Sequence, residues 1–152
     1  MEPKTGLDVE YLMTVYVPLH APQLVTSNLH IYASKPGGWI SGPRIKGEVI
    51  APTADWLRVM PNGVRNLDVR LSILADDGCF IYMRYLGRIV NADRLQRWPN
   101  PPVAGIHFMI NPVFETDSKK YGWPSDLVCV GKNFERKDGD DRCVSYEIFS
   151  LS

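Results

Sequence analysis

Side chains that could bind an anion and move a proton recur at two-residue spacing in the middle of the chain. Asp68 and Arg70 are two residues apart, as are Tyr82 and Arg84, so in β-strands each pair would project from one side. An arginine can hold an anion or enolate oxygen, a carboxylate can act as a base, and a phenol can donate its proton to a ligand carbonyl. Facing a cavity, these groups would form a catalytic site. Facing water, they would form a solvated face or a structural ion pair, and the residues alone leave this choice open.

Two further titratable residues are candidates for proton transfer. Glu115 follows Phe114 near the end of an apolar segment; burial there would raise the pKa of its carboxyl group toward neutrality. The alternative is a strand-end glutamate that accepts backbone hydrogen bonds. His107 is the one group that titrates near neutral pH at a plausible wall position, and its alternative is a packed or rim histidine.

Large aromatic side chains could line a pocket for an aromatic or polycyclic ligand. The candidates are Trp56, Tyr121 and Trp123, which could equally pack in the core or at an end of the fold. Arg44, in a Gly-Pro-Arg sequence, could reach the mouth of a cavity or form a salt bridge at a strand start. Arg84 could contact a ligand or point into solvent.

The elements that must position these residues read as short antiparallel strands separated by turns. The predicted strands are 9–17, 29–33, 43–51, 55–60, 67–75, 79–85 or 79–89, 105–114, 127–130 and 143–151. Asp76-Asp77-Gly78 fits a tight hairpin that joins the Arg70 strand to the Tyr82 strand. One short helix is predicted at 91–98, ended by Pro99. Eight or nine strands favour a single all-β antiparallel barrel over a sandwich, because closure removes exposed strand edges.

Length and charge limit the classes of protein to consider. The 152 residues suffice for one domain spanning 1–152. Seventeen basic and seventeen acidic residues cancel, which argues against nucleic acid or an anionic membrane surface as a partner. No run approaches the roughly 20 apolar residues of a membrane span. The N-terminus lacks the apolar core of a signal peptide, so a cytoplasmic location is expected.

Metal and cofactor motifs are missing from the sequence. The three cysteines, at 79, 129 and 143, have no metal-ligand spacing and are expected to be reduced. The three histidines are widely separated, and neither a glycine-rich phosphate loop nor a Gly-x-Ser-x-Gly elbow occurs. We therefore expect neither a metal nor a cofactor.

A series of short motifs, taken in order, resembles the domain-of-unknown-function 3237 family, also called uncharacterised protein family 0311. The motifs are Gly37-Gly38, Gly42-Pro43-Arg44, Gly47-Glu48-Val49, Ala54-Asp55-Trp56, Leu67-Asp68-Val69-Arg70, Asp76-Asp77-Gly78, Ile81-Tyr82, Phe114-Glu115-Thr116, Tyr121, Trp123 and Val130-Gly131. The resemblance implies a small calycin-like or allene-oxide-cyclase-like β-barrel that often self-associates. It implies little about chemistry. His107-Phe108-Met109 stands where the family often has Tyr-Phe-Arg, and Pro124-Ser125 where it usually has Leu-Asn; both changes would alter a cavity wall and suggest a specialised ligand.

These observations lead to one functional expectation and two alternatives. We expect a small-molecule-binding barrel that acts as a cofactor-independent isomerase, cyclase or lyase on an apolar, oxygen-bearing secondary metabolite, assembled as a homodimer. The first alternative is a non-catalytic protein that carries or sequesters a small hydrophobic ligand. The second is a structural or interaction subunit whose barrel is filled by its own side chains.

Overall fold

Antiparallel strands make up nearly all of the regular structure. The computed structural model describes residues 1–91 and 106–152, and within them the only helical segments are the 3₁₀ turns η1 (Trp123–Asp126) and η2 (Gly139–Asp141). The predicted helix at 91–98 lies, apart from Asn91, outside the described residues. Within those two ranges no helix is long and apolar enough to cross a membrane.

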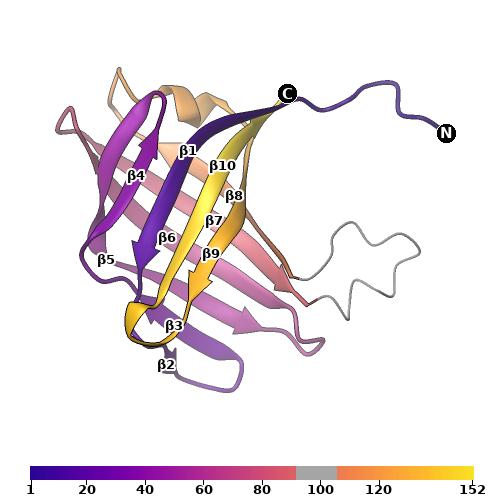
Figure 1. Cartoon of the computed structure of the whole chain (residues 1–152), viewed down its shortest axis with the longest axis vertical. Helices are drawn as coiled ribbons and strands as arrows, with labels where there is room; N and C mark the ends of the chain where they lie inside the picture. Colours follow the sequence, from indigo (N-terminus) through magenta and orange to yellow (C-terminus); the bar gives the residue numbers. More distant parts are fainter. Residues whose placement is uncertain (92–105) are drawn as a thin grey trace.

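Eight strands close into a barrel, in the order β5, β4, β1, β10, β9, β8, β7, β6 and back to β5 (Figure 1). The predicted all-β barrel is thereby confirmed. The strands are β1 (Val9–Pro18), β4 (Gly38–Gly42), β5 (Ile45–Val59), β6 (Arg65–Ala75), β7 (Phe80–Val90), β8 (His107–Glu115), β9 (Cys129–Lys137) and β10 (Cys143–Leu151). The hairpin predicted at Asp76 to Gly78 joins β6 to β7, and Gly78 has the positive φ of 84° that such a turn favours.

The strand β5 runs through both of the predicted strands 43–51 and 55–60, so the break predicted between them is wrong. Its first half pairs with β4, and its second half pairs with β3 (Leu29–Ala33), which lies outside the barrel next to β2 (Gln23–Leu24). Between Ile50 and Ala54, β5 holds two more residues than the facing part of β6. An even number of extra residues preserves the side-chain alternation, so the strand bends without exchanging its faces.

The barrel interior is packed with apolar side chains from alternating strand positions. In β6 these are Leu67, Val69, Leu71 and Ile73, all 5% exposed or less. Two glycines make room for one bulky neighbour: a Cβ at Gly131 would lie 2.5 Å from Ile110 Cγ1, and one at Gly87 would lie 2.8 Å from Ile110 Cγ2. The interior around Ile110 is therefore filled by protein side chains.

The two ends of the barrel differ. The end beside η1 is closed by the buried Tyr121, whose hydroxyl group donates a hydrogen bond to Asp76 in the β6–β7 turn. The Arg44 guanidinium stacks 4.2 Å above the Trp123 ring at this same end. The other end, beside β2 and β3 in Figure 1, contains a pocket.

Candidate binding pocket at the β3 end of the barrel

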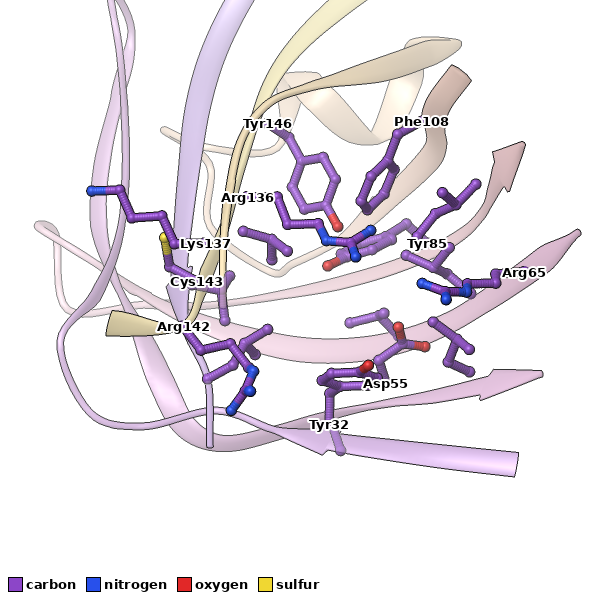
Figure 2. Close-up of a pocket in the computed structure, with 18 of the residues that line it drawn as sticks. Tyr32, Asp55, Arg65, Tyr85, Phe108, Arg136, Lys137, Arg142, Cys143 and Tyr146 are labelled. Carbon is purple, nitrogen blue, oxygen red and sulfur yellow. The ribbon is translucent and has the colours of Figure 1, made fainter. Parts of the chain in front are cut away.

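The pocket is a half-open hollow in the barrel mouth with an apolar interior (Figure 2). Its empty space, counted out to the open mouth, is about 650 Å³. Side chains from β5, β6, β7 and β8 form the apolar wall, namely Leu57, Leu67, Val69, Leu71, Ile89 and Phe108. An apolar wall of this kind suits the hydrocarbon body of a small ligand.

Asp55 is the acidic residue of this wall. The alternation in β5 places Asp55 on the same side as the buried Leu57, and its backbone pairs with Val69 of β6 and Tyr32 of β3. Asp55 Oδ1 accepts a hydrogen bond of 3.0 Å from the Asp68 backbone N–H. This hydrogen bond holds the carboxyl group against β6, and the same residue lines the pocket.

Burial raises the pKa of Asp55 to about 7, because the apolar surroundings disfavour the charged carboxylate. The hydrogen bond from the Asp68 N–H opposes this rise, and the negative charge of the Asp68 side chain adds a smaller upward contribution. Among residues 1–91 and 106–152, no Lys, Arg or His side chain forms an ion pair with Asp55. At neutral pH the group therefore exists both as an acid and as a base.

Two buried tyrosines share the pocket with Asp55. Tyr85 of β7 and Tyr146 of β10 are 3% and 1% exposed, and their rings meet edge to face at 5.4 Å between centroids. Tyr146 also meets Phe108 edge to face, and Figure 2 shows the two hydroxyl groups directed into the pocket. Burial raises the pKa of both phenols. The two tyrosines also act on each other, since the neighbouring Tyr85 raises the pKa of Tyr146 further, and the negative charge of Asp55 makes a smaller upward contribution to both. Both hydroxyl groups therefore stay protonated at neutral pH and can donate hydrogen bonds.

Basic residues surround the pocket mouth: Arg65, Arg136, Lys137 and Arg142. Arg142 lies in the connection between β9 and β10. Its side chain is only 19% exposed, and its Nε lies 4.0 Å from Asp138 Oδ1. Lys137 lies 3.5 Å from Glu135. Within the part of the chain that the structure describes, no three His, Cys, Asp or Glu side chains gather to hold a metal ion.

Asp68 and Arg70 do not face the interior, as a catalytic site would require, and Arg84 takes its solvent-facing alternative. Their side chains lie on the outer wall of the barrel, 38%, 54% and 43% exposed, with Asp68 between the two arginines at 3.9 and 3.8 Å. The predicted alternation is confirmed. The small interior accommodates the apolar side chains of β6, and the charged ones remain in water. Only the Asp68 backbone reaches the pocket residues, through its N–H.

The remaining candidates for proton transfer also lie outside the pocket. Tyr82 and Glu115 pair across β7 and β8 on the outer wall, and both are exposed. His107 is half-buried at the first position of β8 and does not line the pocket. The next residue, Phe108, does line it, because neighbouring residues of a strand face opposite sides.

The aromatic candidates are divided between two other locations. Trp56 lies on the outer side of β5, 41% exposed. Tyr121, Trp123 and Arg44 come together, but at the closed end of the barrel, where they contribute packing and a cation–π contact. None of these four residues lines the pocket.

Reasoning from the sequence did not select the three polar residues that lie inside the pocket. Asp55, Tyr85 and Tyr146 each lie on the side of their strand that carries the buried apolar residues. Asp55, for example, lies two positions before the buried Leu57. A polar residue in the apolar phase of a strand is the available signal, because a barrel has room for it only where the core is incomplete. The predicted site residues Asp68 and Arg70 belong instead to the polar positions of their strand, which face the opposite side.

Comparison with known proteins places the fold in a family. The model of the family described as "Protein of unknown function (DUF3237)" matches residues 7–151. The UPF0311 protein RPA1785 of Rhodopseudomonas palustris is 27% identical over 106 residues, which cover 67% of this chain and 69% of that protein.

Solved structures agree with this placement. The RPA1785 structure, described as a conserved protein of unknown function, superposes with a TM-score of 0.82 at 24% identity over the full length of both chains. A β-barrel-like protein from Acinetobacter baumannii gives a TM-score of 0.78 at 25% identity, again over both whole chains. A structure described as an enzyme from Penicillium herquei shares the fold at a TM-score of 0.66 and 16% identity, covering 100% of this chain and 99% of that one. The family match over nearly the whole length, together with these barrels, shows that this chain belongs to the DUF3237 family.

Proposed function

We propose that the pocket binds an apolar, oxygen-bearing small molecule and that Asp55 transfers a proton within it, as in a cofactor-independent isomerase, cyclase or lyase. One observation carries the proposal: a carboxyl group with a pKa of about 7 lines an apolar pocket that also contains two buried phenols. A general base works best when its pKa lies near the working pH. An acidic residue kept inside a barrel at a cost in stability is also typical of functional sites.

The proposed step needs no oxidant or reductant. The Asp55 carboxylate removes a proton from a carbon next to a ligand carbonyl, and the electron pair moves onto the carbonyl oxygen. A hydrogen bond from Tyr85 or Tyr146 stabilises the resulting enolate. When Asp55 returns the proton to another carbon of the enolate system, the product is an isomer. When the enolate carbon instead attacks a second carbonyl carbon of the ligand, the π electron pair of that carbonyl moves to its oxygen, the oxygen takes the proton from Asp55, and the product is a ring.

The position of these groups supports catalysis more than carriage. A carrier gains affinity from apolar surface alone, and a buried acid without a cation partner would weaken its binding of hydrocarbon. The shared fold of the protein described as an enzyme from Penicillium herquei shows that this barrel can host an enzyme. The alternative, a non-catalytic carrier for a hydrophobic ligand, predicts binding without proton transfer.

Hydrogen exchange on a neutral ketone tests the proposal directly. In D₂O at pD 7.5, the protein should accelerate deuterium uptake by 4-phenylbutan-2-one at the carbons beside its carbonyl, followed by proton NMR. Asp55→Asn should lower the protein-dependent rate by at least about 100-fold, a typical contribution of a general base. Asp117→Asn, an exposed carboxylate distant from the pocket wall, is the matched control.

The pH dependence provides an independent check. Because the base must be ionised, the protein-dependent exchange rate should rise with pH and level off above about 7, following the pKa of Asp55. Ketone binding without accelerated exchange would support the carrier instead. Exchange that survives Asp55→Asn unchanged would refute the assignment of Asp55.

A further inference from the structure

We infer that the ligand of this pocket is a carboxylate with an apolar body, whose anionic head is held at the mouth by Arg142 and Arg136. The inference rests on the proposed binding function and specifies its ligand class. It comes from the charges around the mouth, which an uncharged ligand would leave without a role. Figure 2 shows the guanidinium groups of Arg65, Arg136 and Arg142 on different sides of the pocket.

Arg142 carries most of the argument because its charge is largely withdrawn from water. Its side chain is four-fifths buried. Within residues 1–91 and 106–152 its single ion-pair contact is the 4.0 Å approach to Asp138, whose own side chain is 76% exposed. A contact of that length to a solvated carboxylate offsets little of the cost of burying a guanidinium. The donors of Arg142 that line the pocket are therefore available to a ligand anion.

Arg136 adds a second positive charge above the phenols. It lines the pocket, and its charge is close enough to Tyr146 to act on the pKa of that phenol. No acidic side chain among residues 1–91 and 106–152 pairs with Arg136 or with Arg65. Of the four basic residues in the lining, Lys137 pairs with Glu135. The positive charge available to a ligand therefore comes from the three arginines, in a chain whose net charge is zero.

The arrangement of charges fixes the orientation of the ligand. Apolar side chains and the Asp55 carboxyl group occupy the interior, so an anion placed there would lose its hydration and be repelled. At the mouth the Arg142 guanidinium group matches the two oxygens of a carboxylate, which arginine binds in a bidentate manner, and Arg136 adds a second attractive charge. The hydrocarbon body then extends inward, beside Asp55 and the tyrosines.

Two probes that differ only in the head group test this inference. The affinities of 4-phenylbutyrate and 4-phenylbutan-1-ol for the full-length protein would be measured at 0.15 M KCl and pH 7.5 by proton–nitrogen NMR titration. We expect the acid to bind at least about tenfold more tightly than the alcohol, the contribution of one charged hydrogen-bonded contact. Arg142→Met should remove this preference and leave the affinity for the alcohol within about twofold.

Two more variants separate a pocket contact from a general effect of charge. Arg136→Met should reduce the preference for the acid as well, and it serves as the second variant should Arg142→Met fail to fold. Arg88→Met removes an exposed charge from the outer wall and should leave both affinities unchanged. A preference for the acid that falls equally in Arg88→Met would overturn the inference.

The outcomes distinguish this inference from the function on which it rests. Equal binding of acid and alcohol in the pocket would refute the carboxylate head and leave the binding function intact. Failure of the wild-type protein to bind either probe at millimolar concentration would count against the binding function itself. A preference for the acid that persists in both Arg142→Met and Arg136→Met would assign the anion to other residues and refute the proposed mouth site.

Discussion

Replacing Asp55 with asparagine should stabilise the protein at neutral and alkaline pH. The folded state holds the Asp55 pKa at about 7, above its ordinary value of 3.8. Between these two values the folded chain binds a proton that the unfolded chain has released, so the free energy of unfolding falls as pH rises through this window. Asparagine does not titrate, and its amide oxygen can still accept the hydrogen bond from the Asp68 N–H.

The size of the effect follows from the pKa difference. At 1.36 kcal/mol per pKa unit, the cost of ionising Asp55 reaches about 4 kcal/mol above pH 7. The loss of stability caused by Asp55 is smaller at pH 5, because the folded protein keeps the carboxyl group protonated there. The stability advantage of Asp55→Asn over the wild type should therefore widen by about 3 kcal/mol between pH 5 and pH 8.

Urea denaturation at half-unit intervals from pH 5 to pH 8 measures this difference. The variant and the wild type share every other ionisable group, including Tyr85 and Tyr146 at the site, so subtracting one stability curve from the other isolates the contribution of Asp55. The exposed Asp117→Asn should stay within about 0.5 kcal/mol of the wild type throughout, as for most surface substitutions. Carbon-13 NMR of the Asp55 carboxyl group would give the pKa directly.

A stability difference that does not change with pH would refute this reasoning. It would mean that Asp55 is solvated or paired in solution, and the proposed general base would lose its physical support. An Asp55→Asn protein that is less stable than the wild type at pH 8 would contradict it more strongly, because the carboxylate would then be a stabilising group.

Three further predictions concern packing, the outer wall and assembly. Gly131→Ala should lower the free energy of unfolding by about 1–3 kcal/mol, because the added Cβ would lie 2.5 Å from Ile110 Cγ1. The control Gly6→Ala, whose Cβ would have no atom within 4 Å, should lower it much less in the same thermal or urea unfolding experiment. Arg70→Met and Tyr82→Phe should leave 4-phenylbutyrate binding within about twofold, since both side chains lie outside the pocket; a tenfold loss would restore their predicted role as ligand contacts. Light scattering at micromolar concentration should give the mass of a homodimer, as the near-zero net charge and exposed apolar strand residues favour, and a monomer mass would contradict it.

The strands and the alternation of their side chains could be predicted from the sequence because they depend on local properties. Alternation of apolar and polar residues defines a strand that is buried on one side, and Asp-Asp-Gly defines a hairpin whose third residue accepts positive φ. The strands at 29–33 and 143–151 have the predicted bounds. The long strand β5 was divided wrongly because Pro52 resembles a turn signal, whereas the chain accommodates it at a β-bulge.

Tertiary structure alone decided which polar residues meet in the pocket. The alternation of Asp68 and Arg70 against Val69 and Leu71 is identical whichever face lies inside, and only closure of the barrel places the apolar set within. Asp55, Tyr85 and Tyr146 are 30 or more residues apart in the chain, and their convergence depends on the register of strands from both sides of the barrel. The raised pKa of Asp55 has the same origin, because burial by distant strands, and not its neighbours in sequence, removes the water that would stabilise its charge.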